Sequence, residues 1–254
     1  MTLSDRHQNI VELVKRRGKI SVDELVSEFG VTAQSIRADL RALVEKNQVV
    51  RFHGGVQLPD TKKNLEYEAR RSIAADEKAA IGHRAAELVP DKASLFINIG
   101  TTTEAVARAL ENHQGLLVVT NNINVAESLR FCADIDVVIV GGKVRCSDGG
   151  IVGEEAVDFI SRFKLDLAVV GVSAIDTDGV LLDYDIHEVR VAQAIMGNAR
   201  RTMLVADSSK LSRTAPMRLA TLSDVDVLVT DKIEDDAFRA LCERCGVELI
   251  EACA

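Results

Sequence analysis

The sequence lacks the features that place a protein in a membrane or outside the cell. None of its apolar runs approaches the roughly 20 residues that a membrane-spanning helix needs, which excludes a membrane-spanning protein. Residues 1–7 are polar where a signal peptide would need an apolar segment. We therefore expect a cytoplasmic protein with no membrane partner.

Cysteine is scarce and irregularly spaced. The five cysteines stand at positions 132, 146, 242, 245 and 253, an odd number that does not resemble an extracellular disulfide framework. Cys242 and Cys245 have the spacing of a zinc or redox pair, but no second C-x-x-C and no histidine pair accompany them. We interpret the cysteines as incidental and predict no metal site.

Motifs of cofactor-dependent enzymes are also missing. Gly141-Gly142-Lys143 does not have the G-x-G-x-x-G spacing of dinucleotide-binding proteins, and there is no Walker P-loop. Asp183, Asp185 and the pair His187-Glu188 could serve as acid and base groups, but loop polarity and helix capping explain them equally well. The sequence therefore predicts no cofactor and no catalytic residue.

The composition is that of a globular protein with an uneven charge. The 254 residues are 47% hydrophobic and 28% charged, a mixture able to bury a core without disulfides, and the length suggests one or two domains. The net charge is −8, but residues 1–56 carry nine Lys and Arg against seven Asp and Glu, whereas the remainder carries 22 against 32. A mildly basic head on an acidic body is typical of a nucleic-acid reader attached to a second domain, although solvated surface explains the small excess almost as well.

Residues 1–57 begin with two predicted helices. Apolar residues at helical spacing predict a helix over 6–17 that stops at Gly18. Ser21 and Glu24 form a capping-box pattern that opens a second, short helix, and Gly30 supplies the turn after it because glycine tolerates a positive φ. This order predicts the first half of a helix-turn-helix, whose core spans about 20–39.

A third helix, capped by Thr32 and running to about residue 47, carries two different faces. Ile36, Leu40, Leu43 and Val44 form an apolar stripe for packing. The opposite face offers an amide, two guanidiniums and a methyl group, which can read base edges in a major groove; for an isolated helix a solvated face would be the simpler interpretation. A short helix, a glycine turn and a polar-faced helix together favour a helix-turn-helix. The polar face consists of Gln34, Arg37, Ala38 and Arg41.

Residues 49–56 form an alternating apolar strand broken by a Gly-Gly turn, as in the wing of a winged helix. Arg51 and His53 of this segment are placed to contact phosphate, whereas we expect Asp39 to pair with a nearby arginine because a carboxylate facing phosphate is repelled. The sequence thus predicts DNA binding by Thr32, Gln34, Ser35, Arg37, Ala38, Arg41, Arg51 and His53.

The body of the chain repeats a strand-then-helix pattern after a polar linker over 58–75. Short β-branched runs without alternation predict strands covered on both faces, as in a parallel doubly wound sheet spanning 76–254. Ligands of such sheets bind beyond the carboxyl ends of the strands. The run Gly100–Thr103 stands between a strand and a helix, where hydroxyls and free N–H groups favour phosphate; the alternative is a capping box formed by Thr101 and Glu104.

Further polar residues and glycines follow other predicted strands and could reach the same crevice. The predicted effector-binding residues are Gly100, Thr101, Thr102, Thr103, Asn121, Gly141, Gly142, Arg145, Asp207 and Lys210.

The motifs of both parts resemble those of DeoR-type bacterial transcriptional regulators. The motifs of the head are Val22-x-Glu24-Leu25, Val31-Thr32-x-Gln34-x-Ile36-Arg37-x-Asp39-Leu40 and Arg51-x-His53-Gly54-Gly55. The motifs of the body are G-T-T-T, T-N-N, V-G-G-K, D-G-G-I-V-G and Asp207-Ser208-Ser209-Lys210. The resemblance implies an α/β protein with an N-terminal winged helix-turn-helix. A mostly parallel doubly wound domain follows, similar to the ribose-phosphate isomerase and glucosamine-phosphate deaminase fold.

The resemblance also implies a function. It implies a repressor that binds operator DNA as a homo-oligomer, a dimer or tetramer, and is released by a phosphorylated sugar or polyol, with glycerol 3-phosphate the first candidate. Ala38 stands where the family usually has arginine, Asn98 where it has aspartate, and Ala192-Gln193 where it has Lys-Arg. Two alternatives stay open: a sugar-phosphate isomerase or deaminase with an added DNA-binding head, and an activator on the same scaffold.

Overall fold

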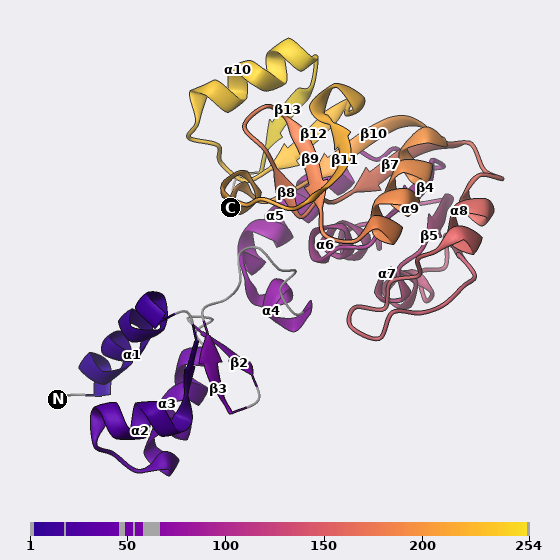
Figure 1. The fold of residues 1–254 in the computed structure, drawn as a ribbon. Helices are drawn as coiled ribbons and strands as arrows, with labels where there is room; N and C mark the ends of the chain where they lie inside the picture. Colours follow the sequence, from indigo (N-terminus) through magenta and orange to yellow (C-terminus); the bar gives the residue numbers. More distant parts are fainter. Residues whose placement is uncertain (1–2, 18, 46–48, 53, 58–66, 253–254) are drawn as a thin grey trace. The chain divides into compact units, whose positions relative to one another are not determined.

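The computed structural model describes the chain apart from residues 1–2, 18, 46–48, 53, 58–66 and 253–254. It divides into two compact units, residues 1–65, here called the head, and residues 66–254, here called the sensor unit (Figure 1). The predicted helix stop at Gly18 and the first part of the predicted linker lie outside the described residues. The rest of that linker contains helix α4 (Tyr67–Ser72) and belongs to the sensor unit.

The head is a winged helix-turn-helix, as predicted. Helices α1 (Leu3–Arg17), α2 (Val22–Phe29) and α3 (Ala33–Glu45) surround a core that includes Ile10, Leu25 and Ile36. The capping box of Ser21 and Glu24 is formed, and Gly30 ends α2 at a φ of 63°. Strands β2 (Val50–Phe52) and β3 (Gly55–Gln57) form the wing hairpin.

A third strand of the head was not predicted from the sequence. Strand β1 (Lys19–Ser21) pairs antiparallel with β3, which gives the sheet order β1-β3-β2. The partners Ile20 and Val56 are both fully buried, so the strand ties the wing to the helical core.

The sensor unit is built on a seven-stranded sheet in which every pair is parallel, in the order β13-β12-β10-β7-β4-β5-β6. Its strands are β4 (Ser94–Ile97), β5 (Leu116–Thr120), β6 (Ile135–Ile139), β7 (Leu165–Val170), β10 (Ala199–Val205), β12 (Val227–Thr230) and β13 (Glu248–Glu251). The helices are α5 (Ala75–Glu87), α6 (Thr101–Ala109), α7 (Ile123–Leu129), α8 (Glu154–Ile160), α9 (Ile186–Gly197) and α10 (Asp236–Cys245). None of the helices in the described part of the chain is both long and apolar enough to cross a membrane.

Separate apolar cores cover the two faces of this sheet. Successive residues of β7 alternate between them, with Leu167 and Val169 in the core shared with α5, α6 and α7, and Ala168 and Val170 in the core shared with α8, α9 and α10. Double coverage explains why the strands are apolar without alternation. A small antiparallel sheet of β8 (Ala174–Ile175), β9 (Val180–Asp183) and β11 (Met217–Thr221) was not predicted.

The strand order creates one crevice at the carboxyl edge of the sheet. The chain runs from β4 outward through β5 and β6, then returns to β7 on the other side of β4 and continues to β10, β12 and β13. The connections therefore diverge between β4 and β7. In open α/β sheets, ligands bind at this topological switch point.

Candidate nucleic-acid interface and ligand crevice

The polar face of α3 is exposed on the head. Ile36, Leu40 and Leu43 are buried in the core of the head, whereas Gln34, Arg37, Ala38 and Arg41 are exposed. The Oγ1 of Thr32 accepts a 3.2 Å hydrogen bond from the Ser35 amide, which caps the helix as predicted. Amide, guanidinium and methyl groups are thus presented along one ridge that a major groove can accept.

Arg51 extends this surface from the wing. Its Nη2 donates to the Arg37 carbonyl oxygen over 3.4 Å, so the wing guanidinium lies against the polar face of α3. His53, the other predicted wing contact, lies outside the described residues.

Asp39 is buried beneath this surface and takes no part in it. Its carboxylate accepts hydrogen bonds from Arg6 Nε at 2.6 Å and Nη2 at 3.0 Å, and lies 3.3 Å from His7 Nε2. Burial acts to raise the pKa of Asp39, but the hydrogen bonds from Arg6 and His7 hold that pKa below its ordinary value. The expected pairing of Asp39 with an arginine is confirmed, and it ties α1 to α3.

In the sensor unit, the segment Gly100–Thr103 begins α6 beside the switch point. Gly100 has a φ of 150°, and no side chain caps the helix. A Cβ at Gly171, directly after β7, would lie 3.6 Å from Thr103 Cγ2, so the segments that follow β4 and β7 are in contact. Uncapped N–H groups at a helix N-terminus favour an anion here. The Thr103 hydroxyl, by contrast, is fully buried and donates to the carbonyl oxygens of Asn98 at 2.7 Å and Gly100 at 2.8 Å.

The alternative, a capping box of Thr101 and Glu104, is not formed. The buried Glu104 carboxylate instead accepts hydrogen bonds from Tyr67 Oη at 2.7 Å and from the Nδ2 atoms of Asn122 and Asn124, each at 3.1 Å. Tyr67 and Asn122 were not singled out in the sequence. Both are far from Glu104 in the chain, so no local pattern indicates that they contact it.

Lys210 follows β10 in a short 3-10 helix (Ser208–Ser212) on the other side of the switch point. Burial lowers the pKa of Lys210 to about 8, Asp207 opposes that shift, and Arg213, Lys78 and Arg70 add to it. Asp207 is itself buried, and its Oδ2 has no hydrogen-bond partner among the described residues. Lys210 therefore lies in the electrostatic field of the Asp207 carboxylate and of three further cations.

Lys78 of α5 belongs to the same group of cations and was missed in the sequence. It is only 5% exposed, and burial lowers its pKa while Asp207 opposes the shift. Its Nζ donates to the carbonyl oxygens of Arg70 at 2.6 Å and Ile73 at 2.5 Å. On an amphipathic helix a lysine normally marks the solvated face, so no sequence signal distinguishes Lys78.

Arg145, a predicted effector ligand, is engaged by three carboxylates. Its guanidinium bonds Asp148 at 2.6 and 2.7 Å and lies 3.2 Å from Asp185 Oδ2 and 2.9 Å from Glu188 Oε2. Burial acts to lower the pKa of Arg145, but the hydrogen bond to Asp148 and the charge of Glu188 hold it above its usual range.

Glu188 is the anomalous member of this group. Its Oε2 is buried and lies 2.9 Å from Arg145 Nη2, but it forms no aligned hydrogen bond with any residue in the described part of the chain. Burial raises the pKa of Glu188 to about 7, and the charge of Asp183 raises it further while Arg145 opposes the shift. A carboxyl group that titrates near neutral pH thus lies beside Arg145.

The remaining predicted ligands lie farther along the sheet. Asn121 follows β5 and binds the Ile151 backbone, with its Nδ2 3.0 Å from that carbonyl oxygen, while its buried Oδ1 has no partner among the described residues. Gly141 and Gly142 follow β6, which is two strands from β4, and are exposed. The structure therefore gathers Gly100–Thr103, Asp207 and Lys210 near the switch point, and leaves the two glycines at the sheet edge.

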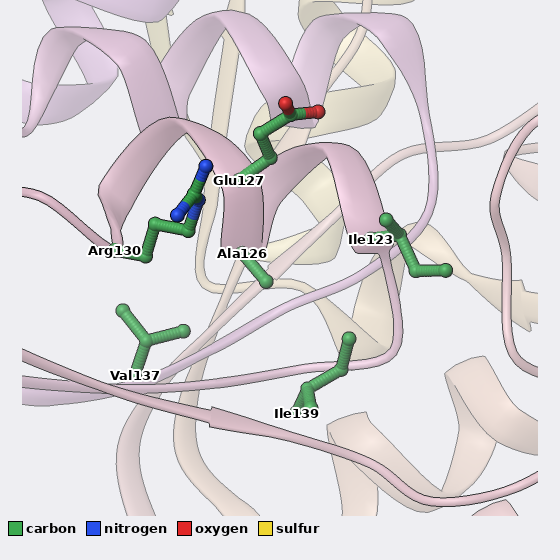
Figure 2. A pocket seen from close by; sticks show the side chains of 6 residues that line it. All are labelled: Ile123, Ala126, Glu127, Arg130, Val137 and Ile139. Atoms are coloured by element: carbon green, nitrogen blue, oxygen red, sulfur yellow. The ribbon is translucent and has the colours of Figure 1, made fainter.

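A separate hollow lies between α7 and the edge strand β6 (Figure 2). Four aliphatic side chains face it, flanked by two charged side chains of α7. None of the predicted effector residues lines it, and its mostly apolar walls do not suit a phosphate. The lining residues are Ile123, Ala126, Glu127, Arg130, Val137 and Ile139.

The cysteines that the structure describes are all unpaired thiols. Cys242 is buried on α10, and burial raises the pKa of its thiol to about 11, with Cys245 adding to the shift. Among the described residues no group of three or more His, Cys, Asp or Glu side chains could hold a metal ion. Cys253 lies outside them.

Comparison with known proteins adds a second line of evidence. Residues 6–62 match the family model described as the DeoR-like helix-turn-helix domain, and residues 73–232 match the DeoR C terminal sensor domain. Similar curated proteins include the glycerol-3-phosphate regulon repressors of Escherichia coli K12, 47% identical over 91% of this chain and 92% of that protein, and of Haemophilus influenzae, 47% identical over 96% and 95%. The transcriptional repressor CsqR of E. coli K12 is 35% identical over 98% and 96%. Among solved structures, ribose 5-phosphate isomerase A from Methanocaldococcus jannaschii is 17% identical over 54% of this chain and 55% of that chain, with a TM-score of 0.40.

Proposed function

This chain belongs to the DeoR family of transcriptional regulators, and we propose that it represses genes of glycerol 3-phosphate metabolism and is released from DNA by that metabolite. It is a DNA-binding repressor with a sensor domain rather than an enzyme, because its close relatives are repressors with the same head. Two relatives that are 47% identical over more than nine-tenths of the chain are glycerol-3-phosphate regulon repressors, which supports glycerol 3-phosphate as the signal.

The observation that carries operator recognition is the two-sided α3. One face is buried in the core of the head, and the other presents Gln34, Arg37, Ala38 and Arg41 to solvent. We propose that this ridge enters the major groove, that Thr32 and Ser35 position the helix start, and that Arg51 and His53 contact phosphate.

For the effector, we propose that Gly100–Thr103 and Lys210 bind the phosphate at the switch point. The uncapped start of α6 and a partly buried ammonium favour a dianion. Asp207, whose buried Oδ2 lacks a hydrogen-bond donor in the described part of the chain, suits a hydroxyl of a polyol.

The other predicted residues act indirectly in this proposal. Asn121 holds the Ile151 backbone, and Arg145 holds Asp148, Asp185 and Glu188 together. Gly141 and Gly142 lead the chain from β6 into the segment that carries Arg145. These residues keep the loops beside the crevice in position.

Repression and release then follow from linkage. Effector binding favours a state of lower operator affinity, and paired heads of a dimer or tetramer read the two half-sites of an operator. We propose that the protein acts as such a homo-oligomer in the cytoplasm.

The test is a titration of the promoter of the chain's own gene. Fluorescence anisotropy of labelled operator is followed with and without glycerol 3-phosphate, and then with a panel of phosphorylated three- to six-carbon metabolites. We expect glycerol 3-phosphate to weaken operator binding most. Release by a different member of the panel would reassign the effector, and no release by any member would refute induction by a phosphorylated metabolite.

A further inference from the structure

Lys78 carries a buried ammonium that forms no ion pair with any residue that the structure describes. The side chain is 5% exposed, and the described residues place no carboxylate within ion-pair distance of it. Its two hydrogen bonds go to neutral carbonyl oxygens, although an ammonium has three N–H groups to donate. Burying a charge without a counter-ion costs free energy. An anion that binds nearby would therefore interact favourably with this ammonium.

The acceptors of Lys78 belong to the end of α4. The carbonyl groups of Arg70 and Ile73 stand at the last turn of α4 and just after it, and Lys78 reaches back to them across Ala74, whose φ is 52°. A non-glycine residue in this conformation is held only where its surroundings enforce it. The hydrogen bonds of Lys78 therefore stabilise the bend between α4 and α5.

The same ammonium lies one turn before Gly82 on α5, where a Cβ would lie 2.6 Å from the backbone of Ala105 on α6, the helix that begins with the crevice threonines. Asp207 and Arg213 both act on the pKa of Lys78, and Lys78 acts on that of Lys210. The other end of α4 also reaches the crevice loops, because Tyr67 donates to Glu104, the residue directly after Thr103. Arg70, in the middle of α4, lies 3.4 Å from Asp148.

We propose that Lys78 is a positioning residue whose ammonium is shared between the phosphate of the effector and the end of α4. This inference rests on the proposed function, since it assigns the regulation of the same crevice. When the phosphate binds, the ammonium turns toward it and weakens its bonds to the Arg70 and Ile73 carbonyls. The bend at Ala74 then relaxes and α4, the first helix of the sensor unit, changes position. In the sequence α4 is the first helix after the head, so a change at α4 is passed along the chain to the DNA-binding unit.

The test compares the full-length protein with Lys78→Met, which keeps the length of the side chain and removes its charge. Two quantities are measured for each protein: the Kd for glycerol 3-phosphate by calorimetry, and the ratio of operator Kd values with saturating and without effector. For the wild type we expect a ratio of at least about 5. For Lys78→Met we expect a ratio below about 2, with glycerol 3-phosphate still bound through Lys210 and the threonines.

Two further variants keep the test decisive. Tyr67→Phe removes the bond from α4 to Glu104 without touching a cation, so it should lower the ratio while leaving the affinity for glycerol 3-phosphate within about twofold; it also serves if Lys78→Met does not fold. Lys92→Met, an exposed lysine that precedes β4, should behave as the wild type.

The outcomes separate the two proposals. A wild type that no phosphorylated metabolite releases would remove the proposed function and this inference with it. A wild type that is released, together with Lys78→Met and Tyr67→Phe variants that keep its ratio, would overturn the inference alone. Complete loss of glycerol 3-phosphate binding in Lys78→Met would also overturn it, because Lys78 would then be an ordinary ligand.

Discussion

Single arginines of the head have different surroundings and should have different tasks. Arg37 projects from the exposed ridge of α3, which we propose enters the major groove, whereas Arg51 comes from the wing and lies against the Arg37 carbonyl. Contacts to base edges specify a sequence, and contacts to phosphate position the protein on any sequence.

Replacing Arg37 by alanine should therefore reduce specificity. If the guanidinium makes a bidentate contact with guanine, the variant loses about 1–3 kcal/mol of binding free energy on the operator and much less on random DNA. Anisotropy titrations on both duplexes measure the difference, with Arg84→Ala, an exposed arginine of the sensor unit, as the control. Equal losses on operator and random DNA would refute the assignment of this face.

Replacing Arg51 by alanine should weaken binding to all DNA sequences by the same factor. A lost phosphate contact releases one counterion fewer, so the slope of log K against log salt concentration should become less negative by about 1. Titrations over a range of salt concentrations measure this slope. An unchanged slope with a selective loss on the operator would mean that Arg51 reads bases.

Glu188 gives the sensor unit a dependence on pH. Its pKa is raised from an ordinary 4.5 to about 7, so between these values the folded state keeps a proton that the unfolded chain has released. The free energy of unfolding therefore falls as the pH rises from about 4.5 to about 7, and is level above. The neighbouring Asp183, whose pKa burial also raises, acts in the same direction.

Glu188→Gln should remove this loss, because glutamine resembles the protonated acid at every pH. The variant should equal the wild type at about pH 4 and below and become more stable as the pH rises to 7, by at most about 3 kcal/mol. Urea unfolding at several pH values measures the difference. A constant difference from pH 5 to pH 8 would show that Glu188 has an ordinary pKa.

At the scale of elements, the close contact of α5 with α6 positions the crevice. A Cβ on Gly82 of α5 would lie 2.6 Å from the backbone carbon of Ala105 on α6, a distance that real Cβ atoms do not show. The two helices carry Lys78 and the threonines of the crevice, so only a glycine at this position lets them approach as they do.

Gly82→Ala should destabilise the sensor unit by about 2–3 kcal/mol, because backbone has to move to admit the methyl group. Gly197→Ala on α9 is the matched control: its Cβ would meet nothing within 4 Å, so the helix propensity of alanine should leave stability unchanged or raise it by up to about 1 kcal/mol. Denaturant unfolding compares the two. Equal stability of both variants would mean that α5 can shift away from α6 at no cost.

For the whole molecule, the proposed repressor must obey reciprocal linkage. If glycerol 3-phosphate weakens operator binding by some factor, operator DNA must weaken glycerol 3-phosphate binding by the same factor, typically 5- to 150-fold. Calorimetry of the effector against free and operator-bound protein at one protein concentration gives the second factor. Unequal factors would show that the effector and the DNA act on different assemblies of the chain.

The periodicities of the sequence determined the elements and their faces. The apolar stripe of α3 left its polar residues on the outside, and the β-branched runs predicted parallel strands covered on both faces. The short strands β1, β8 and β9 were not predicted, because segments of two to four residues hold their conformation only through partners distant in the chain. The five-residue strand β11 was missed as well, although β5 and β6 of the same length were predicted, so local pattern sufficed for the apolar strands of the central sheet but not for every strand.

Only the tertiary structure decided which residues meet. The order that sends β5 to one side of β4 and β7 to the other brings Thr103 to Gly171. Packing across the fold also brings Lys78 of α5 into the field of Asp207, which follows β10. The pairing of Arg145 with Asp185 and Glu188 and the raised pKa of Glu188 depend in the same way on long-range packing, whereas Asp148 is only three residues from Arg145. Burial and charge pairing are properties of three-dimensional neighbours, so a sequence met alone names the residue types of the crevice but not their partners.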